Sequence, residues 1–224
     1  MVLLPVIAFF AVLLAVVFRR HPDAAGRARA LRRLALGLTV VYVIFIGAFI
    51  VGETFADPGG WEAVGLVALW VVPLAGLGLL GWKWPDRARV PLMAVTAAVV
   101  AVNVWYTFDT QHWRTFENAH GPVRGVAAFA LGAALSAYAY RRPLPGGVLL
   151  LVVGVIPVAL SMLATGGLGM SSFGALASPA VLVGLLYLGS STVHGTTSAP
   201  PGRGASPKGS TRAPAGLLGH RRGS

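Results

Sequence analysis

The sequence predicts an all-α integral membrane protein, in which a bundle of seven transmembrane helices is followed by a disordered tail. Three observations predict this fold. Hydrophobic residues make up 56% of the 224 residues and charged residues only 11%, whereas soluble domains carry about 25% charged residues. Seven segments with few or no charges are each long enough to cross a bilayer. The basic residues lie almost entirely in alternate connections between these segments.

A transmembrane helix needs about 20 predominantly apolar residues. The predicted spans are residues 2–18, 34–51, 63–81, 90–108, 122–140, 148–165 and 173–190. The first span ends in Arg19 and Arg20 without a small-residue cleavage site, so we expect a retained helix and not a secretory signal. The fifth begins near Pro122, because proline is tolerated in a first helical turn, and Arg124 extends outward to the interface.

The last two spans need a separate argument, since no Asp, Glu, Lys or Arg lies between Arg142 and Arg203. A single helix over 146–190 would be about 67 Å long, against a hydrocarbon core of about 30 Å. The glycine-rich residues 165–172 provide the break, with glycine ending one helix and serine capping the next. Two full crossings are therefore predicted, and a re-entrant half-helix is the alternative.

The distribution of charge predicts the orientation. Sixteen of the 18 Lys and Arg residues lie in alternate connections and in the tail, and cytoplasmic loops collect such residues. The other side carries Arg114, Arg124 and five acids, Glu53, Asp57, Glu62, Asp109 and Glu117. The N-terminus is therefore predicted outside and the C-terminus in the cytoplasm, with the cytoplasmic loops contacting anionic lipid headgroups of the bilayer. Nucleic acid is not expected as a partner, because insertion into the membrane explains the basic residues.

The chain divides into a transmembrane domain, 1–193, and a tail, 194–224. The tail is rich in Gly, Pro, Ser and Thr and carries five cations and no acid, a composition typical of disorder. The bias of the whole chain toward Ala, Val, Leu, Gly and Arg is typical of a bacterial genome of high GC content. We therefore expect a multi-pass protein of the bacterial cytoplasmic membrane.

The predicted spans contain no Lys and no His. This excludes a retinal Schiff base and a haem held by two histidines, and no cofactor of that kind is expected. Gly76, Gly78 and Gly81 spell the GxGxxG dinucleotide fingerprint, but they lie inside an apolar span without a preceding strand, so the motif lacks its context.

Small residues follow helical spacing in two spans. Ala130, Ala133, Ala134 and Ala137 share one face of the fifth span, and Ala180 and Gly184 form a small-xxx-small pair in the seventh. Such residues let helices approach closely. Packing within the bundle is the favoured interpretation, and docking of a partner's helix is the alternative.

One cluster of potential ligands lies in the outer loop between the fourth and fifth spans. Asp109 and His112 are three residues apart, as are Glu117 and His120, so each pair would share a face of a helix. Two imidazoles and two carboxylates are suitable ligands for zinc or another divalent metal, and Glu53, Asp57 and Glu62 are expected on the neighbouring outer loop. We favour an interfacial loop with water-facing histidines, and a pH-sensitive surface is a further alternative.

Three classes of function follow for a protein whose molecular activity the sequence leaves open. The favoured class is a non-catalytic membrane component that acts through partner helices of a membrane protein or of a second copy. The first alternative is an extracytoplasmic sensor of a metal, pH or a small ligand, which uses the outer loop. The second is a small permease for a neutral or lipid-like solute, with Asn103, Trp70, Pro73 and Pro157 lining a cavity. An enzyme is least expected, because no nucleophile, base and orienting group fall together on one side of the membrane.

Overall fold

The computed structural model describes residues 3–56, 60–109, 111–112, 115, 123–165 and 172–195, and all regular structure within these ranges is helical. The helices are α1 (Leu3–Arg20), α2 (Ala24–Ala56), α3 (Gly60–Lys83), α4 (Pro85–Phe108), α6 (Val123–Arg141), α7 (Pro143–Thr165) and α8 (Ser172–Gly195). The predicted all-α fold is confirmed, and each predicted apolar segment corresponds to one helix. Nearly all of the predicted tail, from residue 196 on, lies outside the described residues.

Two helical segments are long and apolar enough to cross a membrane, Ala24–Phe49 of α2 and Pro85–Phe108 of α4. Shorter apolar helical segments of 10–17 residues occur at Val71–Lys83, Pro143–Pro157 and Pro179–Thr192. The structure thus contains helices able to span a bilayer.

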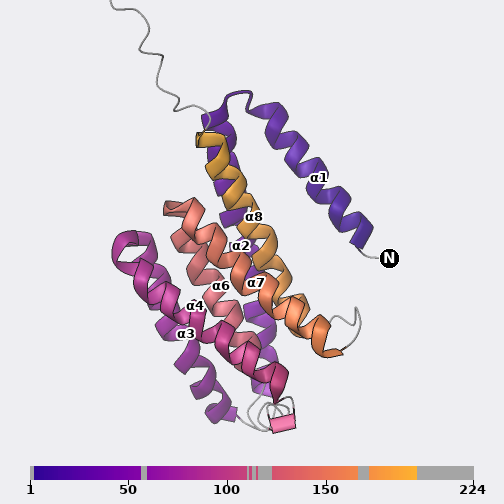
Figure 1. Cartoon of the computed structure of the whole chain (residues 1–224), viewed down its shortest axis with the longest axis vertical. Coiled ribbons are helices and arrows are strands. Elements are labelled where there is room, and N and C mark those ends of the chain that lie inside the picture. Colours follow the sequence, from indigo (N-terminus) through magenta and orange to yellow (C-terminus); the bar gives the residue numbers. More distant parts are fainter. Residues whose placement is uncertain are drawn as a thin grey trace, which may run out of the picture.

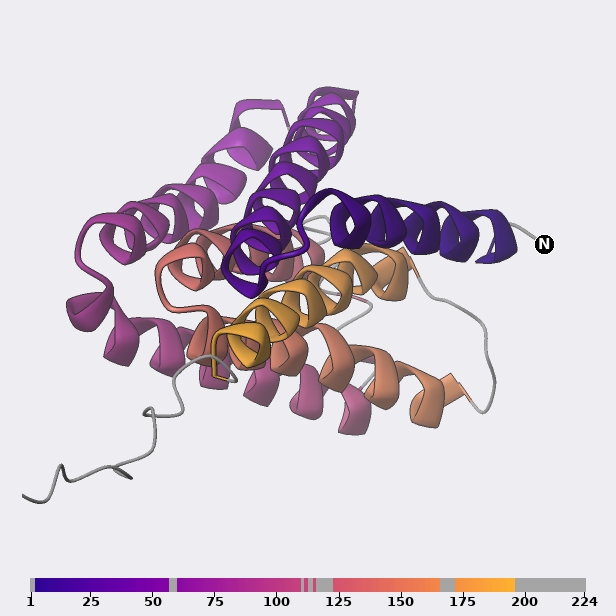
Figure 2. The ribbon, with the colours of Figure 1, turned by 90° about the horizontal axis from the view of Figure 1, so that it is seen from above.

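The helices form an elongated bundle around α6 (Figures 1 and 2). Leu131, Leu135 and Tyr138 of α6 are at most 1% exposed and belong to the core cluster that also contains Leu150 of α7 and Tyr187 of α8. Figure 1 shows α3 and α4 together on one side of the bundle, whereas α1 diverges from it. The core is therefore centred on α6 and includes residues of α2, α3, α4, α7 and α8.

The small residues of α6 serve packing within the bundle, as the favoured interpretation predicts. A Cβ atom added to Gly78 of α3 would lie 3.2 Å from Cα of Ala134, and one added to Gly81 would lie 3.0 Å from Cβ of Tyr138. Gly78 and Gly81 of the GxGxxG segment thus allow α3 to approach the backbone of α6, whereas Gly76 faces open space. Ala130 and Ala134 are buried by this contact and by the remaining core.

The helices α7 and α8 are 23 and 24 residues long and lie side by side in opposite directions (Figure 1). The chain therefore turns back after Thr165, where the glycine-rich break was predicted. Both helices have the length of a full helix of this bundle, which agrees with two complete helices and not with a half-helix. The connection, 166–171, lies outside the described residues.

Several helices are longer than predicted, α2, α4, α7 and α8 among them, and the largest difference is at the start of α2. Residues 19–33 were expected to form a connection, but α2 already begins at Ala24. Residues 24–36 are mostly Ala, Arg and Leu, which favour helix, and Ala28, Leu31 and Ala35 place one apolar face in the core. Likewise α4 begins at Pro85 and not near residue 90, with proline in its first turn.

Candidate functional site

One end of the bundle is strongly basic. The start of α2, the end of α8 and the α3–α4 and α6–α7 turns lie toward this end (Figure 1). All eleven Lys and Arg side chains that the structure describes belong to it, together with Asp23 and Asp86. Arg142 forms an ion pair of 2.7 Å with Asp86 across two helix ends, and because both side chains are exposed, this pair adds little stability. The charge segregation read from the sequence is thus present in three dimensions.

Aromatic side chains accompany the basic residues at this end. Trp82 stacks on Tyr140 with ring centroids 5.0 Å apart, and the Arg141 guanidinium lies 5.2 Å from the centroid of the Trp82 ring. Trp84 is 53% exposed in the single-residue connection between α3 and α4. Rings with one apolar and one polar side are typical of a membrane–water interface.

The predicted outer-loop site is described only in part. Asp109 follows the end of α4, and its Oδ1 accepts a hydrogen bond of 3.3 Å from the backbone N–H of His112. The His112 side chain is exposed. Glu117, His120 and Asp57 lie outside the described residues, as do the side chains of Glu53 and Glu62. Among the residues that the structure describes, no three His, Asp or Glu side chains gather as metal ligands, and the metal site stays a prediction.

A chain of hydroxyl groups crosses the core between three helices. Thr39 Oγ1 of α2 lies 2.7 Å from Ser136 Oγ of α6, which in turn lies 3.2 Å from Tyr187 Oη of α8. Thr39 Oγ1 also donates to the Ala35 carbonyl oxygen at 2.9 Å, so it accepts the hydrogen of Ser136 Oγ. These three residues are buried. Because their polar atoms satisfy one another, the chain of hydroxyls ties α2, α6 and α8 together without leaving an unpaired group.

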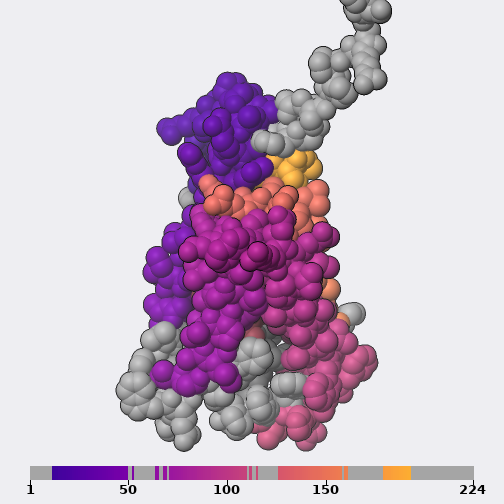
Figure 3. Space-filling model, turned by 90° about the vertical axis from the view of Figure 1, so that its left-hand side faces the viewer, coloured from indigo at the N-terminus to yellow at the C-terminus, as the bar shows by residue number. Residues whose placement is uncertain are grey.

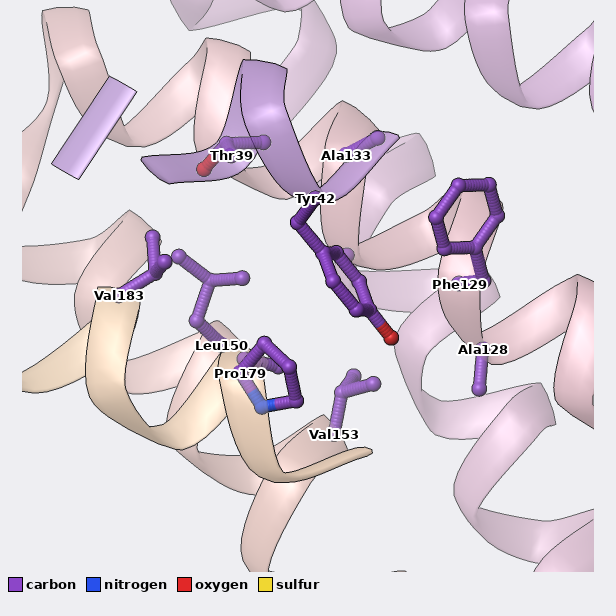
Figure 4. Close-up of a pocket in the computed structure, with 11 residues that line it drawn as sticks. Thr39, Tyr42, Ala128, Phe129, Ala133, Leu150, Val153, Pro179 and Val183 are labelled. Carbon is purple, nitrogen blue, oxygen red and sulfur yellow. The ribbon is translucent and has the colours of Figure 1, made fainter. Parts of the chain in front are cut away.

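A small cavity adjoins this chain of hydroxyls (Figure 4). Its volume is about 20 Å³, which is enough for one water molecule. Figure 4 shows the ring of Tyr42 between Phe129 of α6 and Leu150 and Val153 of α7, and Tyr42 packs edge to face against Phe129 at 5.4 Å. A solute larger than water does not fit in this space.

The residues predicted to line a permease cavity are not brought together where the structure describes them. The Asn103 amide donates a hydrogen bond of 2.8 Å to the Val99 carbonyl oxygen of its own helix. Pro73 is exposed on α3, whereas Pro157 is buried in α7. The side chain of Trp70 lies outside the described residues. None of the three described side chains lines the cavity beside Tyr42.

The middle of the outer face of α4 is made of small residues and is covered by no other described helix, whereas large exposed side chains flank it toward both helix ends, among them Val90 and Phe108. Ala94, Ala97, Ala98 and Ala101 are all exposed and form two overlapping small-xxx-small pairs. Figure 3 views the side of the molecule on which the magenta surface of α3 and α4 lies. The opposite face of α4 contains the residues that are buried in the bundle, Ala88, Leu92, Thr96, Val99 and Asn103.

The middle of the outer face of α2 differs in character from that of α4. It consists of large side chains, Val40, Val41, Ile44, Phe45 and Phe49, which are 49–77% exposed. Large, flexible apolar side chains suit contact with lipid tails, whereas a smooth face of alanines permits a second helix to approach closely. The small-residue face of α4 is therefore the strongest candidate for a functional surface.

Comparison with known proteins adds no relative to these observations: no family model matches the chain, and neither a curated protein nor a solved structure is detectably similar to it.

Proposed function

We propose that the protein is a seven-span, non-catalytic component of the bacterial cytoplasmic membrane, which binds a transmembrane helix of a partner on the small-residue face of α4. The partner is another membrane protein or a second copy of this chain. In this proposal the N-terminus is outside and the basic end of the bundle faces the cytoplasm. The exposed Ala94, Ala97, Ala98 and Ala101 are the observation that carries it.

The membrane placement is supported by charge and exposure. The described cations gather at one end of the bundle, as cytoplasmic connections require. Large apolar side chains cover the outer face of α2, and removing each of them from water is worth about 1.5–3 kcal/mol. A bilayer provides the apolar surroundings that the bundle itself does not supply for these side chains.

The docking role is supported by how the helices pack inside the bundle. Where α3 meets α6, Gly78 lies against Ala134, and where α7 meets α8, Gly147 lies against Gly184. Close contacts in this protein thus use small residues on both helices. Small residues also recur on α4, but there the alanines point away from the bundle. We therefore infer that a helix of a partner covers them.

The interior favours a binding role over transport. The cavity that the structure describes in the core holds about one water molecule. Thr39, Ser136 and Asn103 of the core pair with one another or with their own helices. The hydroxyl of Thr96 in α4 is buried without a partner, but no wide cavity adjoins it among the described residues. A path for a solute would require a much wider polar or apolar channel.

Site-specific cross-linking in native membranes tests the proposal. The chain contains no cysteine, so Ala98→Cys and Val41→Cys each introduce a single thiol, and both positions lie near the middle of their predicted spans. A thiol-reactive photocrosslinker attached to either residue probes the face of α4 or of α2. We expect a discrete cross-linked product from Ala98→Cys and none from Val41→Cys, and a product of twice the chain mass would identify a second copy.

A substitution that blocks the face provides the control. Ala97→Leu adds bulk to the exposed surface without disturbing the buried face, so it should weaken the cross-link from Ala98→Cys while the chain remains folded in the membrane. Equal products from both cysteine positions would show unspecific neighbours and contradict the proposal. Absence of a product from Ala98→Cys would also contradict it.

A further inference from the structure

A second surface, between α1 and α2, combines apolar walls with cationic groups. The C-terminal half of α1 and the N-terminal part of α2 enclose a cleft with a volume of about 390 Å³. Four residues of α1 between Val12 and Val17 and Leu34 of α2 form its apolar walls, and Arg20 and His21 lie at its polar end. Its volume falls within the range of about 300–1,000 Å³ that is typical of ligand pockets.

Specific contacts in the α1–α2 turn set the angle at which α1 leaves the bundle. The Asp23 carboxylate accepts a hydrogen bond of 2.7 Å from the Gly26 N–H and so caps α2. Arg27 donates to the Pro22 carbonyl oxygen at 3.2 Å, and its guanidinium lies 5.6 Å from the centroid of the Phe18 ring. These contacts in the turn therefore fix the geometry of the cleft.

The charges around the cleft select its occupant. Arg19, Arg20, Arg29 and Arg33 surround the turn, and the one described acid among them, Asp23, is engaged in capping. The tail of this chain carries five cations and no acid, so it is repelled by this end. A second copy would present the same basic end. The occupant must be anionic at one end and apolar along the rest.

We propose that this cleft binds one anionic phospholipid, with the headgroup phosphate at Arg20 and His21 and an acyl chain against Val12, Val16 and Leu34. The proposal rests on the membrane placement of the proposed function, which puts the basic end at the cytoplasmic leaflet. Basic pockets between transmembrane helices on that side are known to hold anionic headgroups. The lipid site lies between α1 and α2, whereas the docking face lies on α4.

Native mass spectrometry of the full chain in mild detergent tests the site, with phosphatidylglycerol and phosphatidylcholine as the added lipids. We expect one phosphatidylglycerol to be retained in preference to phosphatidylcholine. Arg20→Gln should lower this affinity about fivefold, the equivalent of one cation near the phosphate. Arg87→Gln removes an exposed cation in the first turn of α4, away from the cleft, and should leave the retention unchanged.

A second variant addresses the apolar walls. Val16→Trp fills the cleft and should lower retention while Arg20 is intact, and circular dichroism checks that the helical content is preserved. Equal retention of both lipids by the wild-type chain would overturn the proposal, as would equal losses in Arg20→Gln and Arg87→Gln. A protein cross-linked to Val16→Cys in place of lipid would also overturn it. These outcomes leave cross-linking at Ala98→Cys unaffected, so the two proposals fail separately.

Discussion

Gly147 of α7 and Gly184 of α8 face each other so closely that a Cβ atom added to either would lie 3.0 Å from the carbonyl oxygen of the other. Backbone atoms form this contact, so neither helix can relieve it by rotating a side chain. The antiparallel pair of α7 and α8 therefore depends on both glycines. Small residues fix the spacing of helices in this bundle at several points, and the following predictions begin there.

Gly184→Ala should lower the melting temperature of the purified protein. The added methyl group would meet the Gly147 carbonyl oxygen and also lie 3.2 Å from Cβ of Leu150, and overpacking of this kind costs about 1–3 kcal/mol. Gly37→Ala is the matched control, since nothing lies within 4 Å of its added Cβ and alanine favours helix. If Gly184→Ala kept the wild-type melting temperature while Gly37→Ala lowered it, the close contact between α7 and α8 would not limit the stability of the bundle.

Ser136→Ala should destabilise the bundle by about 1 kcal/mol, because Ser136 makes two interhelical hydrogen bonds and each is worth about 0.6 kcal/mol in membrane proteins. Denaturation of the protein in detergent measures the change. Thr192→Ala removes an exposed hydroxyl that bonds only within α8, and it should have little effect. Combining Ser136→Ala with Thr39→Val should cost less than the sum of the single changes. Strict additivity would contradict the hydrogen bond between them.

Asp23 should make the start of α2 sensitive to acid. The hydrogen bond from the Gly26 N–H, with the nearby charges of Arg29 and His21, holds the pKa of the Asp23 carboxyl below its usual value of 3.8. A lowered pKa stabilises the folded state above pH 3.8, and this contribution is lost as the pH falls through the folded-state pKa.

Hydrogen exchange of the Gly26 amide checks this prediction. Exchange corrected for intrinsic rate should increase below about pH 4. Asp23→Asn should retain the cap and remove the pH dependence, because asparagine is also a good capping residue. A wild-type profile that Asp23→Asn leaves unchanged would assign the effect to another group.

The outer-loop metal site can be tested by zinc titration. Because Asp109 accepts a hydrogen bond from the His112 backbone, we expect the loop to act as an ordinary interfacial loop. Zinc should therefore change the melting temperature equally in the wild type and in a variant with His112→Ala and His120→Ala. A zinc-dependent shift that the double variant loses would establish the metal site and favour the sensor function.

The sequence predicts well the positions of the seven long helices that the structure describes, because apolar segments of this length leave few alternatives. The prediction from apolar segments fails at Arg27 and Arg29. They were assigned to a connection on charge alone, but Ala28, Leu31 and Ala35 between and after them form an apolar face that extends α2 by ten residues. A hydrophobic periodicity of three to four residues was the available signal.

The candidate docking face was harder to predict. Ala134 and Ala98 belong to similar runs of small residues, yet Ala134 is 3% exposed against Gly78, and Ala98 lies on the open face of α4. Spacing identifies a smooth helix face but does not show which helix covers it, because that depends on how all the helices are arranged. The cleft at Arg20 was missed for the same reason, since it forms only where α1 diverges from α2.

The most direct test of the membrane placement, on which both proposals depend, is thiol labelling of single-cysteine variants in spheroplasts. Gln111 lies beyond the end of α4, and Arg33 is exposed near the basic end. A membrane-impermeant maleimide should label Gln111→Cys in intact spheroplasts and label Arg33→Cys only after the membrane is opened with detergent. Labelling of Arg33→Cys in intact spheroplasts, with Gln111→Cys protected until detergent is added, would invert the topology. Full labelling of both before detergent would contradict the placement of the bundle across the membrane.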